Sequence, residues 1–153
     1  EVTRIPPPKK TPFYLAGLLN DTKALVDCGN VSLNIYVDPV DTMIYADRVQ
    51  LQQVFVNLLK NAAEACNLRG GVQWIEVRSH IAPDEKVCIE VSNSGGAIPA
   101  DIAENIFTPF FTTKHDGSGI GLAVSKQIIR LHGGTLRLAH NNDEKVTFLI
   151  VLE

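Results

Sequence analysis

The stretch DRVQLQQVFVNLLKNAAEAC, residues 47–66, decides the fold of this 153-residue chain. Apolar side chains recur along it at the spacing of one helix face, and Asp47 stands at its start as a candidate N-cap, so the stretch is predicted to form an amphipathic helix. The apolar arc of this helix contains Leu51, Val54, Phe55, Leu58, Leu59 and Ala62. An arc of this width has to be buried, so we expect the helix to form part of the core.

Strand patterns lie on both sides of this central helix. Two short extended segments precede it, and two pairs of alternating segments that predict antiparallel hairpins follow it. Their ranges are 31–37 and 42–46, then 71–80 with 85–93, and 135–140 with 144–152. Further helices are predicted over 13–27 and from about 119 to a stop at Gly133 and Gly134. The sequence therefore predicts an α+β two-layer sandwich, in which helices cover one face of a single mixed, mostly antiparallel sheet.

The composition is that of one ordinary globular domain, with 45% hydrophobic and 20% charged residues. The net charge of −3 comes from 14 basic and 17 acidic residues spread along the chain, which argues against nucleic acid as a partner. Three widely spaced cysteines are expected to be small buried hydrophobes in a reducing compartment. No apolar run is long enough to cross a membrane, so we expect no direct membrane contact by this domain.

The first residues differ in composition from the rest of the chain. RIPPPKKTP, residues 4–12, is proline-rich and basic, and proline restricts its own backbone and that of the residue before it, so the segment is predicted to stay extended. We interpret residues 1–11 as a linker and residues 12–153 as the folded domain. The abrupt start indicates a piece of a longer protein.

A polar stripe borders the apolar arc of the central helix. Asn57, Asn61 and Glu64 follow one another at helical spacing and so share one side of it. Magnesium in nucleotide sites takes one or two protein oxygens together with the phosphates, and this stripe can supply them. The alternative is a solvated helix face. Asparagine is a poor helix former, however, so two of them one turn apart favour a functional role.

Three loop segments complete the candidate site. DGSGIGL, residues 116–122, opens a helix, where glycines let backbone N–H groups approach phosphate oxygens; an ordinary helix start is the alternative, because the segment is neither a P-loop nor a dinucleotide fingerprint. VSNSGGAIP, residues 91–99, ends a strand in a tight turn. NIFTPFFTTKHDG, residues 105–117, combines phenylalanine anchors with small polar residues, which is typical of a lid, although a core-anchored loop has the same pattern.

The order of these segments resembles the nucleotide boxes of the sensor histidine kinase catalytic domain, from about Pro12 to Glu153. The similar stretches are NLLKNAAEA (57–65, the N box), NSGGAIP (93–99, the first glycine box), IFTPFFTTK (106–114, the F box) and GSGIGL (117–122, the second glycine box). The resemblance implies the Bergerat fold, shared with gyrase, the heat-shock chaperone and the mismatch-repair ATPases. It also implies ATP and Mg²⁺ as cofactors.

The resemblance further implies roles for single residues. Asn61 is similar to the family's magnesium-holding asparagine, and Asn57 and Lys114 to residues of the transfer reaction. At the position of Asn57 the ATPase branches carry a glutamate that activates water, and an amide cannot act as a general base. The nucleotide-binding residues that the resemblance implies are Lys60, Asn61, Glu64, Asn93, Gly95, Ala97, Ile98, Phe107, Thr113, Lys114, Gly117, Ser118, Gly119, Ile120, Gly121, Leu122 and Thr147.

Two residues depart from the family pattern in the first glycine box. Asn93 stands where an aspartate usually accepts a hydrogen bond from the adenine amino group, and Ala97 replaces a glycine. Asparagine still has an acceptor oxygen, but a neutral hydrogen bond is about half as strong as a charge-assisted one. We therefore expect ATP to bind more weakly than it would to an aspartate version.

The resemblance implies a protein histidine kinase of a two-component phosphorelay. The chain would transfer the γ-phosphate of ATP to a histidine on a separate dimerisation domain, and a response regulator receiver domain would be the next partner. None of the four histidines in the chain looks like the acceptor. A degenerate nucleotide-binding or interaction module is the first alternative, and a free-standing ATPase or serine kinase the second. We expect a cytoplasmic domain, with a parent protein that is either free or anchored in the inner membrane.

Overall fold

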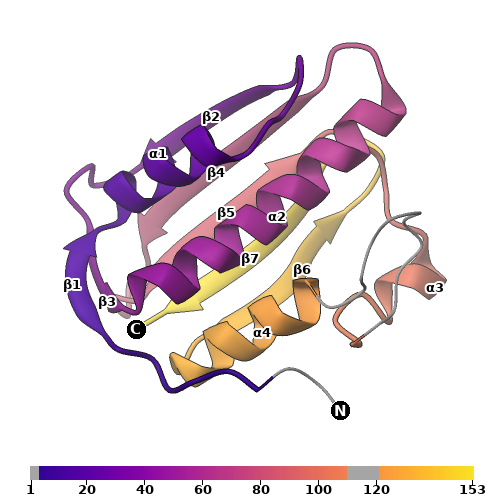
Figure 1. Ribbon diagram of the computed structural model, residues 1–153. Helices are drawn as coiled ribbons and strands as arrows, with labels where there is room; N and C mark the ends of the chain where they lie inside the picture. Colours follow the sequence, from indigo (N-terminus) through magenta and orange to yellow (C-terminus); the bar gives the residue numbers. More distant parts are fainter. Residues whose placement is uncertain (1–3, 110–120) are drawn as a thin grey trace.

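The computed structural model describes residues 4–109 and 121–153. Helices lie on one face of a twisted sheet, as Figure 1 shows, so the predicted α+β two-layer sandwich is confirmed. The elements are β1 (Thr11–Tyr14), α1 (Leu15–Leu25), β2 (Ser32–Val37), β3 (Met43–Ala46), α2 (Arg48–Arg69), β4 (Trp74–Ile81), β5 (Val87–Asn93), α3 (Ala100–Ala103), α4 (Gly121–Leu131), β6 (Thr135–Asn141) and β7 (Val146–Leu152).

The main sheet within the described residues has five strands in the order β2-β4-β5-β7-β6. The β4–β5 and β6–β7 hairpins are antiparallel, as predicted, and β5 pairs antiparallel with β7. Strand β2 runs parallel to β4, which makes the sheet mixed. The last strand in sequence, β7, thus lies inside the sheet and joins the two hairpins.

A second, two-stranded sheet was not predicted. Strand β1 pairs antiparallel with β3, and Phe13 lies opposite Ile44. The prediction that a helix begins at Phe13 is therefore wrong: the helix begins at Leu15, whose N–H donates to the Thr42 carbonyl at 2.9 Å. Pairing with a strand 30 residues further on overrides the local helical pattern, as tertiary contacts commonly do.

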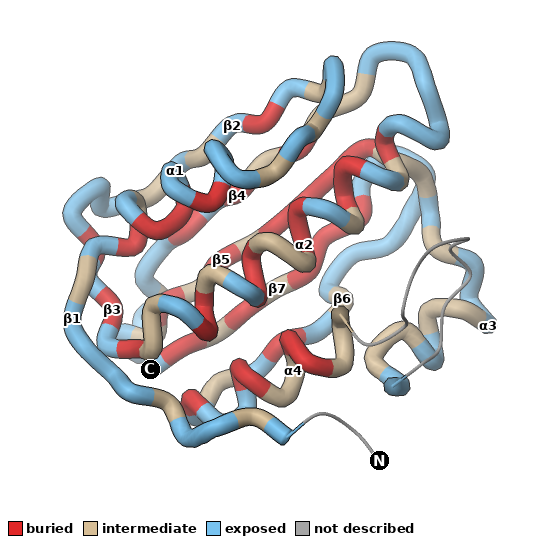
Figure 2. Tube along the Cα trace, in the orientation of Figure 1, coloured by how far each residue is buried: buried red, intermediate tan, exposed pale blue. Residues whose placement is uncertain are grey.

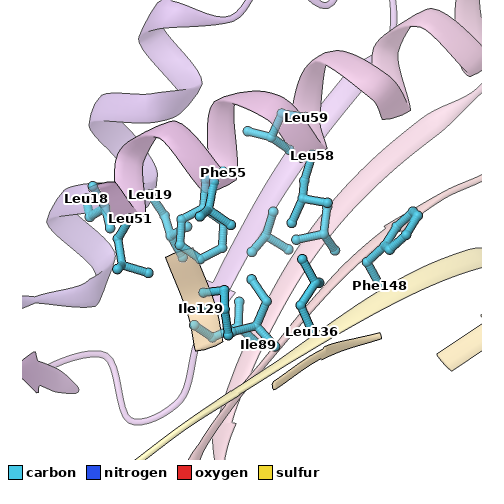
Figure 3. Close-up of a cluster of buried hydrophobic side chains, with 14 of the residues drawn as sticks. Leu18, Leu19, Leu51, Phe55, Leu58, Leu59, Ile89, Ile129, Leu136 and Phe148 are labelled. Carbon is cyan, nitrogen blue, oxygen red and sulfur yellow. The ribbon is translucent and has the colours of Figure 1, made fainter. Parts of the chain in front are cut away.

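The central helix α2 supplies the middle of the core. Its inward arc is the one predicted from the sequence, and each of the six residues is at most 3% exposed. Figure 2 shows the buried side of α2 facing the sheet, and Figure 3 shows its side chains packed against those of β5, β6 and α4. The labelled residues are Leu18, Leu19, Leu51, Phe55, Leu58, Leu59, Ile89, Ile129, Leu136 and Phe148.

The ends of the two site-forming helices follow their sequence signals. Asp47 caps α2 by accepting from the Gln50 N–H at 3.1 Å, and Gly70, at φ 75°, ends the helix with its N–H donating to the Cys66 carbonyl. Helix α4 ends before Gly133, also at φ 75°. The predicted cap at Asp47 and the predicted stop at Gly133 are confirmed, whereas the end of α2 at Gly70 was not predicted.

The proline-rich segment before β1 lies along the domain. Residues 4–10 have no regular secondary structure, and Ile5 packs against the core. The Pro6 carbonyl accepts from Nε2 of Gln50 at 2.9 Å, and the Lys9 N–H donates to the Asp47 carboxylate at 2.8 Å. The segment is therefore fastened to the first turn of α2.

The burial of the three cysteines agrees only in part with the prediction. Cys66 is buried, and burial is the main cause that raises the pKa of its thiol; Cys28 and Cys88 are only half-buried, contrary to prediction. All three are free thiols.

Within residues 4–109 and 121–153, no helix combines the length and the apolar character needed to cross a bilayer.

Candidate functional site

The polar stripe of α2 faces the start of α4. Asn57 is half-buried, and its Nδ2 donates to the Gly121 carbonyl at 3.1 Å and to Oγ of Ser125 at 3.2 Å. A Cβ placed on Gly121 would lie 3.6 Å from Cγ of Asn57, so the two residues are in contact. The amide of Asn57 therefore fixes the first turn of α4 against α2.

The same side of α2 meets the turn after β5 two helical turns later. A Cβ on Gly95 would lie 2.6 Å from Cβ of Ala65 and 2.8 Å from its carbonyl carbon, distances that no side chain can occupy. Gly96 follows with φ 100°, which favours glycine. The glycines of this turn thus serve a close approach to α2 and a left-handed backbone.

Asn61 lies midway between these two contacts. Residues 57, 61 and 65 are spaced by four, so they follow one side of α2, and the span from Asn57 to Ala65 is about 12 Å at 1.5 Å per residue. Asn61 is half-buried, whereas Lys60 and Glu64 are exposed beside it. The stripe is therefore bounded by Gly121 at one end and Gly95 at the other, with an amide at its centre.

Asn93 lies buried at the end of β5, next to the glycine turn. It is 5% exposed, and its Oδ1 accepts from the Gly95 N–H at 2.7 Å. Val146 of β7 lies opposite it in register and is 2% exposed. The bend that follows the strand is thus organised by the side chain of its own last residue.

Arg69, which was not predicted as a site residue, fastens the glycine turn to α2 and to the connection between β6 and β7. From the last turn of α2 its Nη1 donates to the Ser94 carbonyl at 2.7 Å and to the Asp143 carbonyl at 2.6 Å. Asp143 belongs to the connection between β6 and β7. The only sequence signal was a basic residue in the last turn of a helix. Such residues are common there because they interact favourably with the helix dipole, so the signal does not indicate a contact with the glycine turn.

Ala97 and Ile98 are held from the same connection. The Ala97 N–H donates to Oδ1 of Asp143 at 3.2 Å, and the Ile98 N–H donates to Oδ1 of Asn141 at 2.8 Å. Nδ2 of Asn141 returns a bond to the Ile98 carbonyl at 2.8 Å. The backbone of the first glycine box is therefore anchored on both sides, by α2 and by the last hairpin.

Thr147 does not join this group. It lies opposite Ser92 in register, and the two hydroxyl groups are 2.7 Å apart. Because side chains alternate along a strand, Thr147 and Ser92 point to the face of the sheet opposite to Val146 and Asn93. The residue of β7 nearest to Asn93 is thus the apolar Val146.

Phe107 and Leu122 pack beside the site. The Phe107 ring meets the Phe148 ring edge to face at a centroid distance of 6.1 Å, and Nζ of Lys126 lies 4.3 Å from its centroid. Leu122 is half-buried against the core. The predicted site residues Thr113, Lys114, Gly117, Ser118, Gly119 and Ile120 lie outside the described residues.

A shallow groove of about 480 Å³ lies on another side of α2. It is lined by Asp27, Lys60, Ala63, Glu64, Asn67 and Leu68. It shares Lys60 and Glu64 with the predicted site but contains neither asparagine of the stripe and no residue of the glycine turn. We assign the site from the contacts of Asn57, Ala65 and Asn93. In the described part of the chain, no three His, Cys, Asp or Glu residues gather as a metal site.

Curated relatives of the chain are sensor proteins. It is 38% identical to the sensor protein FixL of Bradyrhizobium diazoefficiens over 142 residues, which is 90% of this chain and 28% of FixL. It is 35% identical to the sensory histidine kinase/phosphatase NtrB of Rhizobium leguminosarum bv. phaseoli, over 95% of this chain and 42% of NtrB. The chain thus spans less than half the length of these relatives.

Solved structures give the same result. The nucleotide-free catalytic domain of the histidine kinase ThkA has a TM-score of 0.79 and 32% identity, over 94% of this chain and 95% of that domain. ThkA in complex with the response regulator TrrA has a TM-score of 0.72 and 30% identity, over 94% of this chain and 41% of that one. The model of the histidine kinase-, DNA gyrase B- and HSP90-like ATPase family matches residues 46–153. The chain therefore belongs to this ATPase family, as an ATP-binding catalytic domain of the sensor histidine kinase type.

Proposed function

We propose that this domain transfers the γ-phosphate of ATP to a histidine on a separate dimerisation domain of its parent protein. The proposal rests on the arrangement of residues along one side of α2. Asn61 lies there between the contact of Asn57 with Gly121 and the contact of Ala65 with Gly95, which are about 12 Å apart along the helix. A span of this length accommodates an extended nucleotide. One end meets a helix N-terminus, which favours phosphate, and the other a buried polar turn.

The donor set on this side of α2 fits Mg-ATP. The amide oxygen of Asn61 is a hard ligand of the kind that Mg²⁺ takes alongside phosphates, and Glu64 follows on the same side three residues later. Asn93 and the turn from Gly95 to Ile98 would hold the base. Bound Mg-ATP would supply the phosphoryl group and the cation that neutralises its charge. Thr113, Lys114 and residues 117–120 remain proposed phosphate contacts.

Asn57 favours transfer to a protein side chain over hydrolysis of ATP. Its Nδ2 is a donor to the Gly121 carbonyl and to Ser125, and an amide has no basic site with which to activate water. Its role in this proposal is to position α4. The free-standing ATPase alternative is therefore disfavoured.

The setting in a longer protein is part of the same proposal. Residues 1–11 would connect the domain to a hairpin that carries the acceptor histidine, and a receiver domain would take the phosphoryl group onward. The complex of the similar kinase ThkA with a response regulator supports the second partner. We place the domain in the cytoplasm, with its parent either free or anchored in the inner membrane.

Calorimetric titration with a non-hydrolysable ATP analogue tests nucleotide binding. The chain should bind in a magnesium-dependent manner, and Asn61→Ala should weaken binding at least about tenfold, the loss expected for a metal-ligand contact. Asn34→Ala, at an exposed position of β2, is the matched control and should bind like the parent chain. An Asn61→Ala variant that keeps both the affinity and the magnesium dependence of the parent chain would contradict the assignment of the metal ligand.

The degenerate-module alternative rests on one observation, the neutral Asn93 beside the apolar Val146. A full-length parent that binds ATP but never labels its own histidine from γ-labelled ATP would establish this alternative. Labelling that Asn57→Ala diminishes and Asn34→Ala leaves intact would establish the kinase.

A further inference from the structure

Asn141, the last residue of β6, forms a pair with the backbone of Ile98 through two hydrogen bonds. The Ile98 N–H donates to Oδ1 of Asn141 at 2.8 Å, and Nδ2 of Asn141 donates to the Ile98 carbonyl at 2.8 Å. The amide can lie only in this orientation, because turning it over would set donor against donor and oxygen against oxygen. A side-chain amide thus occupies both backbone groups of Ile98, as a neighbouring strand would.

Asp143 holds the same turn by a second route. Its Oδ1 accepts from the Ala97 N–H at 3.2 Å. Its backbone carbonyl accepts from Nη1 of Arg69 at 2.6 Å, and the same nitrogen donates to the Ser94 carbonyl at 2.7 Å. The end of β6 and the connection that follows it are therefore linked to both ends of the glycine turn.

The turn depends on such contacts because it has no regular structure of its own. Residues 94–99 belong to no helix or strand, so no ladder of backbone hydrogen bonds fixes them, and their N–H and C=O groups need other partners. The connection between β6 and β7 is itself closed, since Oδ1 of Asn142 accepts from the N–H groups of Glu144 and Lys145 at 2.9 Å each. It is thus an ordered support for the turn.

We propose that Asn141 and Asp143 are positioning residues for the nucleotide, which fix the place of the glycine turn without touching the nucleotide themselves. This inference rests on the proposed function, in which the turn from Gly95 to Ile98 holds the base. Both residues lie outside the four nucleotide boxes, so the motif order gave no sign of them.

This role predicts a particular kinetic effect. The base lies at the opposite end of the nucleotide from the γ-phosphate, so the turn holds it equally in the bound state and in the transition state of transfer. Loss of such uniform binding raises KM for ATP and leaves kcat unchanged. Loss of stability alone does the reverse, because fewer folded molecules lower the apparent kcat and leave the KM of the remainder unchanged.

The two residues use different polar groups, and this difference can be tested. Asn141 uses a donor and an acceptor, so Asn141→Asp would keep the acceptor for the Ile98 N–H but set a carboxylate oxygen against the Ile98 carbonyl. The side chain of Asp143 uses only an acceptor, so Asp143→Asn keeps the contact with Ala97 and Asp143→Ala loses it. An amide is required at position 141, whereas any acceptor suffices at position 143.

Autophosphorylation of the full-length parent from γ-labelled ATP, at a series of ATP concentrations, measures KM and kcat. Asn141→Asp and Asp143→Ala should each raise KM at least about threefold, the effect of about one neutral hydrogen bond, with kcat within about twofold of the parent value. Asp143→Asn should restore the parent KM. Asn142→Asp is the control for the added negative charge: its oxygens still accept within the hairpin, so it should keep the parent KM.

The outcomes separate this inference from the proposed function. A parent-like KM in Asn141→Asp, or a lower kcat at unchanged KM, overturns the positioning role and leaves the proposed function standing. An equal rise of KM in Asn142→Asp assigns the effect to charge and overturns the role of the amide. A parent that never labels its histidine overturns the proposed function. The affinities of the same variants of the chain for a non-hydrolysable ATP analogue then decide the inference, which equal affinities, or no binding at all, would overturn as well.

Discussion

The backbone N–H of Asp47 donates to Nε2 of His132 at 3.0 Å and joins the start of α2 to the end of α4 across 85 positions of sequence. Since Nε2 accepts, the ring proton lies on Nδ1, which donates to the Ile128 carbonyl at 2.8 Å. His132 is thus a buried bridge that sets the two site-forming helices relative to each other.

Replacing His132 by phenylalanine should lower the free energy of unfolding by about 1–3 kcal/mol, because the Asp47 N–H loses its acceptor in a partly buried position. Urea denaturation measures the change. The matched control is His80→Phe at an exposed position of β4, which should change stability by less than about 0.5 kcal/mol. Equal losses in both variants would show that the bridge contributes nothing specific.

The free energy of unfolding should decrease at acid pH because the Asp47 carboxylate becomes protonated. Burial raises the pKa of its carboxyl, but this is outweighed by hydrogen bonds from the backbone N–H groups of Lys9, Gln50 and Val49, so the pKa is lowered in the folded state. A lowered folded pKa gives stability that is present above the unfolded value and lost as the pH drops below about 4.

The Asp47 contribution is isolated by Asp47→Asn. The stability difference between the parent chain and this variant should be constant from about pH 5 to pH 7 and shrink below about pH 4, as measured by denaturant unfolding. Asp101→Asn, at an exposed site of α3, serves as control and should show no such convergence. A difference that grows in acid would have the wrong sign for this cap.

Gly95→Ala should displace the first glycine box from α2. The added methyl group would overlap Ala65, so the turn must shift, at a cost of about 1–3 kcal/mol in stability and at least about tenfold in nucleotide affinity. Gly17→Ala in α1 is the control: the nearest atom to its new Cβ is 4.0 Å away, and alanine there should stabilise by about 0.5–1 kcal/mol. Thermal unfolding and titration distinguish the two.

Arg69→Met should loosen the same turn from the side of α2. Both hydrogen bonds from the guanidinium to carbonyl oxygens would be lost. We expect the free energy of unfolding to fall by only about 1 kcal/mol, because the side chain lies at the surface, and nucleotide binding to weaken several-fold. Arg137→Met on exposed β6 is the control. Unchanged binding by Arg69→Met would mean that the turn is held by its other contacts alone.

The elements of the fold could be predicted where they depend on a local sequence pattern. The arc of α2, its cap at Asp47 and both hairpins follow from periodicity and turn residues. Strand β1 and the parallel pairing of β2 with β4 were not predictable, because they depend on partners far away in sequence. In the same way, the motif order identified Asn57 and Asn93, whereas only the register showed that Val146 rather than Thr147 lies beside Asn93.

The interior place of β7 determines when this domain can fold during synthesis. The β4–β5 hairpin can form as soon as it leaves the ribosome, but β6 cannot join the sheet until β7 has emerged and paired with both β5 and β6. Until then the edge of β5 has no partner strand. A stop codon within residues 146–152 would therefore release an open-edged, aggregation-prone species rather than a slightly shortened domain.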